Sequence, residues 1–111
     1  MASGRLGKAD LTAATVATLY TCPADIFTIA SVSICNRSNS AVAVRIAIAD
    51  TDTPAASEYI EFDAELLPKG VLERTGLALS ATQKIVVRSS GANVSAVAFG
   101  IESDVPVVAA P

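Results

Sequence analysis

The chain has 111 residues, enough for one domain with one core, and it carries a net charge of −3 with no histidine. Its eight lysines and arginines are scattered, which disfavours nucleic-acid binding. The lack of histidine removes the commonest general base and metal ligand. No apolar stretch approaches the roughly 20 residues that span a bilayer. We therefore expect no nucleic-acid partner, no membrane insertion and no small-molecule substrate.

The composition is apolar but poor in large side chains. Hydrophobic residues make up 51% of the chain, aromatic residues only 5%, and the mean hydropathy is +0.50. Such a core is either completed by a partner subunit or is an ordinary sandwich core of valine, isoleucine and alanine. Both alternatives stay open at this point.

The N-terminal third begins without a clear pattern. Residues 1–12 contain two glycines and mixed charges, and we expect them to form an extended N-terminal arm. Residues 15–21 alternate between two faces and are rich in β-branched side chains, which predicts a strand. Pro23 ends this strand because proline cannot donate a hydrogen bond to a ladder.

Residues 25–50 carry the strongest signal. Residues 26–35 and 41–49 form two apolar runs, and the second run places Val42, Val44, Ile46 and Ile48 on one face. This period of two predicts strands. The polar link at residues 36–40 has a common hairpin length, so we expect a central antiparallel hairpin.

The remaining segments repeat the same pattern. Residues 58–63 alternate, with Ile60 and Phe62 expected in the core. Residues 71–79 allow a helix, but Gly76 favours a bulged strand. Residues 84–88 and 94–101 predict the last strands.

Strands that recur every 10 to 12 residues predict an all-β fold. We expect a single antiparallel β-sandwich, jelly-roll-like, with about seven to eight strands. The expected domain covers residues 13–103. Residues 104–111 are expected to form an extended, apolar C-terminal arm.

No catalytic, cofactor-binding or metal-binding residues are predicted. Asp50 and Asp52 offer carboxylates to Ca²⁺, but the spacing lacks the glycine and distant glutamate of a calcium loop, so a solvated loop is favoured. Cys22 and Cys35 lack a redox or catalytic context and are expected to be free thiols. The sequences beginning at Asn36 and Asn93 fit the glycosylation sequon, but both asparagines lie in predicted turns.

Four residues are candidates for an interface. Val105, Val107 and Val108 give the C-terminal arm an apolar surface. Arg45 interrupts a face of small residues. It either pairs with a carboxylate of a partner, pairs within the sheet with Glu58 or Glu61, or lies exposed on a wet face.

Residues 4–103 resemble small virion proteins of tailed bacteriophages. The segments that carry the resemblance are Gly4-Arg5-Leu6-Gly7-Lys8-Ala9-Asp10-Leu11, Leu19-Tyr20-Thr21-Cys22-Pro23-Ala24, Ser33-Ile34-Cys35-Asn36-Arg37, Val44-Arg45-Ile46-Ala47-Ile48-Ala49, Leu72-Glu73-Arg74-Thr75-Gly76 and Phe99-Gly100-Ile101-Glu102. The resemblance implies a β-sandwich structural subunit and carries no active-site residues.

The expected function is a non-enzymatic structural subunit of a virion, made in the bacterial host cytoplasm. It would assemble in multiple copies on the tail, neck or fibre, with itself and other virion proteins as partners. A capsid decoration protein is the alternative. A glycan- or surface-binding module is a further alternative, disfavoured because alternation places the three phenylalanines in the core.

Overall fold

The computed structural model describes residues 2–105 and contains eight β-strands. The strands follow one another with short connections, and a single turn of 3₁₀ helix, η1 (Ala56–Glu58), precedes β5. The strands are β1 (Ser3–Leu11), β2 (Ala17–Thr21), β3 (Ile26–Asn36), β4 (Val42–Ala49), β5 (Tyr59–Leu66), β6 (Val71–Leu79), β7 (Lys84–Ser89) and β8 (Val94–Asp104).

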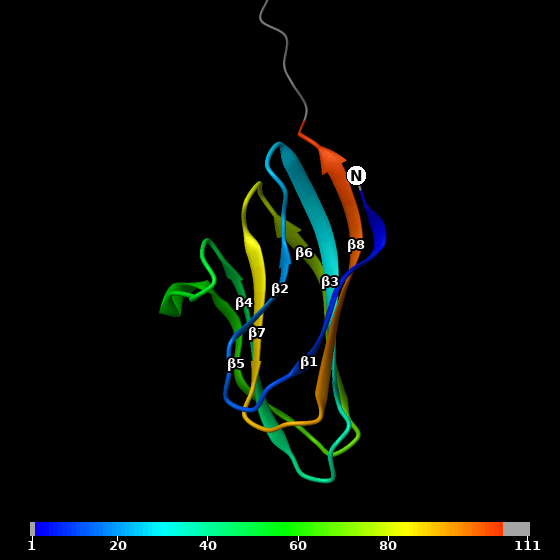
Figure 1. The fold of residues 1–111 in the computed structure, drawn as a ribbon, viewed down its shortest axis with the longest axis vertical. Helices are drawn as coiled ribbons and strands as arrows, with labels where there is room; N and C mark the ends of the chain where they lie inside the picture. Colours follow the sequence, from blue (N-terminus) through cyan, green and yellow to red (C-terminus); the bar gives the residue numbers. More distant parts are fainter. Residues whose placement is uncertain (1, 106–111) are drawn as a thin grey trace, which may run out of the picture.

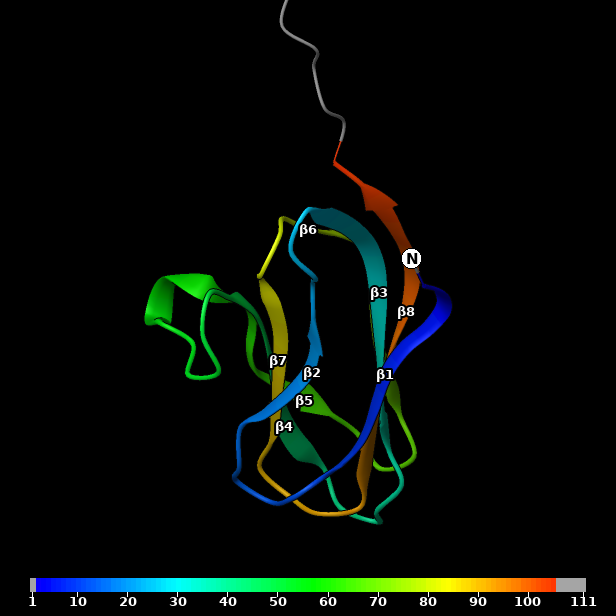
Figure 2. The ribbon, with the colours of Figure 1, turned by 45° about the horizontal axis from the view of Figure 1, so that its top comes forward.

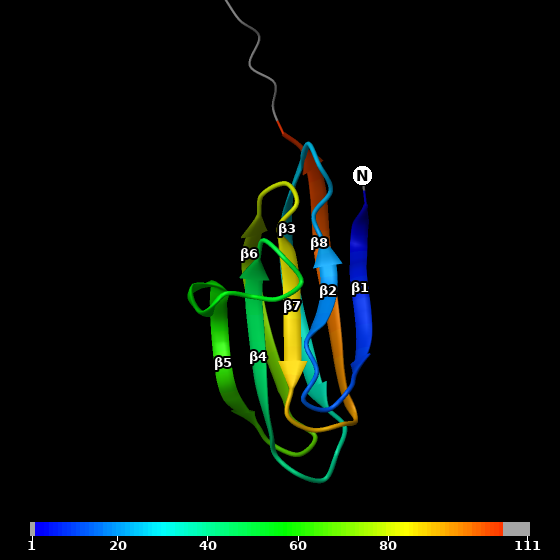
Figure 3. The same cartoon turned by 60° about the vertical axis from the view of Figure 1, so that its left-hand side comes forward.

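The strands form two four-stranded antiparallel sheets that pack face to face, with the orders β1-β8-β3-β6 and β2-β7-β4-β5. Figure 3 shows β5, β4, β7 and β2 side by side in front of the other sheet. Most connections pass from one sheet to the other, and this strand order is that of an eight-stranded jelly roll. The predicted β-sandwich is therefore confirmed.

The core lies between the two sheets and consists mainly of β-branched and small side chains. Alternate residues of β3, β4 and β8 point into it, as the period of two requires. Because the central residues are fully buried, the described chain builds a closed core by itself. The largest fully buried apolar side chains of this core are Ile34, Ile46, Leu79, Ile85, Val32, Val44, Val87 and Val94.

The predicted central hairpin is wrong. β3 pairs with β6 and β8, whereas β4 pairs with β5 and β7, so the two strands belong to different sheets. Their link therefore crosses between the layers at the lower end of the sandwich in Figure 1. The alternation along each strand is the same in a hairpin and in a crossover, so the pattern alone could not distinguish them.

Asn36 organises this crossover. Its side chain is fully buried, and its Nδ2 lies 2.8 Å from the carbonyl oxygen of Ser40, 3.1 Å from that of Leu66 and 3.2 Å from that of Leu67. Its Oδ1 accepts hydrogen bonds from the backbone N–H and the hydroxyl of Ser38, at 3.0 and 2.7 Å. Such burial leaves no room for a glycan, so the sequon at Asn36 has no accessible acceptor in the folded chain.

The expected N-terminal arm is for the most part a strand of the sandwich. Ser3–Leu11 form β1, which pairs with β8 from Ser3–Ile101 to Leu11–Val94. The register shifts between Arg5 and Gly7, and this irregularity hides the period of two in the sequence. The domain therefore begins before residue 13. At the other end, Asp104 still belongs to β8.

Bulges in β5 and β6 decide which side chains face outward. Two residues of β5, Phe62 and Asp63, lie opposite the single residue Arg45, and Asp63 has a φ of +53°. The extra residue turns Phe62 out of the core, and its side chain is 59% exposed, contrary to the prediction. In β6, Gly76 has a φ of +69° at a register shift, which confirms the predicted bulged strand.

The segment between β4 and β5 projects from the body of the sandwich, as Figure 2 shows for the green loop that contains η1. Glu58 closes this loop on itself. Its carboxylate accepts hydrogen bonds from the backbone N–H groups of Asp50 at 3.0 Å and Ala55 at 2.7 Å. Within residues 2–105, no helix has the length and hydropathy needed to cross a membrane.

Candidate interaction surfaces

The outer face of the β1-β8-β3-β6 sheet carries a group of exposed large apolar side chains. Ile29 and Ile101 lie directly opposite each other on β3 and β8, with exposed fractions of 42% and 59%. Phe27 and Phe99 flank this pair along the same strands and are also exposed. Because side chains two residues apart share a face, the four form one surface. We call Phe27, Ile29, Phe99 and Ile101 the outer apolar patch.

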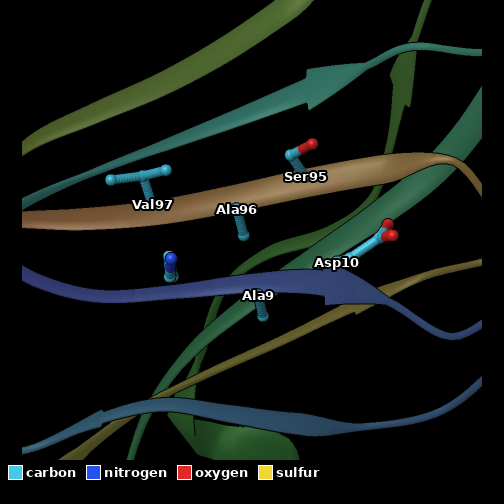
Figure 4. Close-up of a pocket in the computed structure, with 6 residues that line it drawn as sticks. Ala9, Asp10, Ser95, Ala96 and Val97 are labelled. Carbon is cyan, nitrogen blue, oxygen red and sulfur yellow. The ribbon is translucent and has the colours of Figure 1, made fainter.

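The other half of the same face is lined by small side chains. Ser33 and Cys35 of β3 lie opposite Val97 and Ser95 of β8. A shallow hollow opens here between β1 and β8. Figure 4 shows Ser95 and Val97 on one side of β8 and Ala96 on the opposite side. The residues that line the hollow are Lys8, Ala9, Asp10, Ser95, Ala96 and Val97.

The two edges of this face carry opposite charges. Lys8 of β1 lies opposite Val97 of β8, and Val97 lies opposite Ser33 of β3. Ser33 in turn lies opposite Glu73 of β6. One row across the sheet therefore has a lysine at one end and a glutamate at the other. Within residues 2–105, neither of them forms an ion pair.

Arg45 lies on the outer face of the other sheet and is engaged within its own chain. Its Nε donates to Asp63 Oδ1 at 2.6 Å and its Nη2 to Asp63 Oδ2 at 3.2 Å. Its guanidinium carbon lies 4.0 Å from the centre of the Phe62 ring, and the Tyr59 ring is nearly perpendicular to the Phe62 ring, with the two ring centres 5.1 Å apart. These hydrogen bonds hold the pKa of the Asp63 carboxyl below its usual value. The predicted pairing within the sheet occurs, but with Asp63 instead of Glu58 or Glu61, because the bulge places Asp63 beside Arg45.

The remaining carboxylates of this region are dispersed. Glu61 pairs with Arg74 of β6, which joins the open edges of the two sheets. Asp52 accepts a hydrogen bond of 2.6 Å from the hydroxyl of Thr18. Among the described residues, no group of three or more cysteines, aspartates or glutamates could hold a metal ion.

Both cysteines are free thiols, as predicted. Cys22 is fully buried beside Thr28, and its sulfur lies 3.3 Å from the carbonyl oxygen of Ile26. Cys35 is half-buried on the outer face of β3, opposite Ser95. Only Cys35 is therefore placed to react with a reagent in solution.

A polar cluster closes the end of the sandwich where β8 finishes. The Tyr20 hydroxyl donates to Glu102 Oε2 at 2.5 Å and lies 2.7 Å from the hydroxyl of Thr28. Glu102 Oε1 accepts a hydrogen bond of 2.8 Å from the backbone N–H of Ala2. These hydrogen bonds lower the pKa of Glu102. The pKa of Tyr20 is raised, mainly by burial and to a lesser extent by the hydrogen bond to Glu102. The cluster joins β2 to β8 and to the N-terminal segment.

Replacing Tyr20 by phenylalanine is expected to lower the free energy of unfolding by about 1.5 kcal/mol at pH 7, because a charge-assisted hydrogen bond is lost. Since the folded-state pKa of Glu102 lies below the unfolded value, its contribution is complete above about pH 4.3 and disappears as the pH falls through the folded-state pKa. The difference between wild type and Tyr20→Phe should therefore shrink in acid. Urea unfolding between pH 2.5 and 7 measures it, and a difference that does not change with pH would contradict the assigned role of Glu102.

Of the C-terminal interface candidates, Val105 lies at this same end. Val105 is 44% exposed, and its backbone N–H donates to the carbonyl of Asp25 at 3.2 Å. Val107 and Val108 lie outside the described residues.

Sequence reasoning missed the outer apolar patch, although one signal was available. Residues 26–30 are mostly apolar on both faces, more than one buried face needs.

Comparisons of the chain with protein-family models, with curated proteins and with solved structures found no match.

Proposed function

We propose that this chain is a non-enzymatic structural subunit of a tailed bacteriophage virion that assembles in multiple copies on the tail, neck or fibre. The observation that carries the proposal is the outer apolar patch. Four large apolar side chains share one solvent-facing sheet surface although the core beneath them is complete. Contiguous apolar surfaces of this kind mark interaction sites in soluble proteins.

Two further observations support the proposal. The strand order is that of a jelly roll, an architecture that viral capsid proteins use widely, and that lectins and cupins also use. Because a fold alone does not define a function, the surface has to distinguish these uses. The segments that resemble phage virion proteins include Phe99-Gly100-Ile101-Glu102, which contributes two members of the patch.

The glycan-binding alternative has weaker support. Phe27, Phe62 and Phe99 are exposed, so the sequence-based argument that placed them in the core is wrong. A sugar ring, however, stacks on a free aromatic face. The Phe62 ring already carries the Arg45 guanidinium on one face and also packs against the Tyr59 ring.

The proposal is tested by locating the chain on purified phage particles with gold-labelled antibodies raised against the recombinant protein. Particles from a phage that lacks the coding sequence provide the control. Gold on the tail, neck or fibre is the expected result. Gold distributed over the head shell would replace the proposed location by the capsid decoration alternative. Particles without specific label would overturn the proposal.

A further inference from the structure

We propose that the outer face of the β1-β8-β3-β6 sheet binds the same face of a second copy of this chain. The resulting dimer would have a two-fold axis that runs along the strands, between β8 and β3. The inference deepens the proposed function, on whose multiple-copy assembly it rests, by naming the first partner and the surface.

The pairing register supports this choice of partner. Rotation about an axis between β8 and β3 exchanges these two strands, so Ile101 of one copy lies over Ile29 of the other copy, and the reverse contact forms by symmetry. The same operation places Phe99 over the Ser31 position of the other copy. A large side chain thus meets a small one, and the large side chains of the two layers can interdigitate.

Charge complementarity selects the direction of the axis. A rotation along the strands brings the β1 edge of one copy over the β6 edge of the other, so Lys8 meets Glu73 twice. Packed sheets cross at about 30°, which displaces edge residues by about one residue, within reach of two long side chains. Within one chain the same two residues lie about 14 Å apart, because three strand spacings separate them.

The alternative two-fold axis, which runs across the strands, does not fit this face. An axis across the middle of the face would bring the basic β1 edges together and would place the outer apolar patch over the half lined by Ser33 and Ser95, whereas an axis across the patch itself would leave that other half uncovered. Asp10, the acidic residue of the β1 edge, is already neutralised by Arg37 at 2.5 Å within the chain. Both the apolar and the charged residues therefore favour the axis along the strands.

The first experiment measures the solution mass by light scattering over a range of protein concentrations. The wild-type chain is expected to have twice the mass of the 11.3 kDa monomer. Ile101→Asp should raise the dissociation constant by about 100-fold, because each interface would bury two unpaired carboxylates. Leu67→Asp is the matched control, since Leu67 is 60% exposed, as against 59% for Ile101, and follows β5 of the other sheet.

A charge exchange tests the orientation. Lys8→Glu and Glu73→Lys should each raise the dissociation constant by about 10-fold, because each creates two like-charged contacts. The double variant restores opposite charges and should return to within about 3-fold of wild type. Both positions are exposed edge residues, so circular dichroism spectra are expected to match wild type. A double variant as weak as the two single changes combined would overturn the proposed axis.

Cys35 gives an independent readout on the native chain. It lies on the proposed interface, whereas Cys22 is fully buried in the core. Maleimide labelling of Cys35 should slow at least 10-fold between dilute and concentrated protein. It should stay fast at all concentrations in Ile101→Asp. Labelling that does not depend on concentration in the wild type would overturn the proposed surface.

The outcomes separate this inference from the proposed function. A monomeric wild-type chain that still labels phage tails would overturn the dimer and leave the virion role standing. A dimer that persists in Ile101→Asp but is lost when residues 106–111 are deleted would assign assembly to the C-terminal segment instead, and would overturn the proposed face. A dimer that behaves as described, with no label on particles, would support the surface and overturn the virion role.

Discussion

Asn36→Ala is expected to lower the free energy of unfolding by about 3–4 kcal/mol, because this buried side chain makes several hydrogen bonds. The change removes a buried donor from the carbonyls of Ser40, Leu66 and Leu67. It also removes the acceptor of two Ser38 hydrogen bonds. Unsatisfied buried polar groups cost about 1–3 kcal/mol each, and partial access of water to this loop limits the sum.

Thermal and urea unfolding measure this loss. A midpoint shift of about 15 °C corresponds to it for a domain of this size. Asn39→Ala provides the control, because Asn39 lies in the same loop and is exposed. We expect that control to stay within about 0.5 kcal/mol of wild type. Equal effects of the two changes would show that Asn36 does not organise the crossover.

Gly100→Ala is expected to cost about 3 kcal/mol or more through a backbone clash. A Cβ atom at this position would lie 2.1 Å from the carbonyl oxygen of Ile29 and 2.8 Å from the Cα atom of Ala30. β8 is held between β1 and β3, so it cannot move away without breaking a ladder on one side. A substitution that overpacks the fold, so that the backbone itself has to move, is among the most destabilising single changes.

Gly76→Ala separates this clash from conformational strain. Gly76 has a φ of +69°, and no atom lies near the position that a Cβ would take. The only cost of alanine there is the strain of holding it in the left-handed conformation, about 1 kcal/mol of stability. Urea unfolding of both variants under the same conditions gives the comparison. A Gly100→Ala loss no greater than that of Gly76→Ala would contradict the close approach of β8 and β3.

The strand positions could be predicted from the sequence, whereas the partner of each strand could not. Val42, Val44 and Ile46 alternate as a half-buried strand must, and all three are buried. The same alternation is compatible with pairing to β3 or to β5 and β7. In the crossover, the side chain of Asn36 is hydrogen-bonded to the carbonyls of residues 66 and 67, and these partners are distant in the sequence.

A bulge explains why the orientation predicted for Phe62 is wrong. A strict period of two placed Phe62 in the core, and the extra residue of β5 opposite Arg45 moved it to the surface. The same bulge gave Arg45 a different partner from the two glutamates considered. A non-glycine residue at positive φ, such as Asp63 with its φ of +53°, is a weak signal in a sequence, so neither result was predictable.

The candidate site was only partly predictable. Val105 and Arg45 are at the surface, as an interface requires, but Arg45 is occupied by Asp63. The outer apolar patch depends on β3 and β8 being neighbours, and their pairing joins residues about seventy positions apart. The row from Lys8 to Glu73 spans three strand pairings, so no local pattern could reveal it.

The role proposed for the chain is that of a structural subunit present in multiple copies in a virion. Its most direct test is the copy number of the chain per purified particle, measured by quantitative mass spectrometry against the major capsid protein. We expect a constant, multiple-copy ratio that survives repeated density-gradient purification. A ratio that falls toward zero with each purification step would contradict this role.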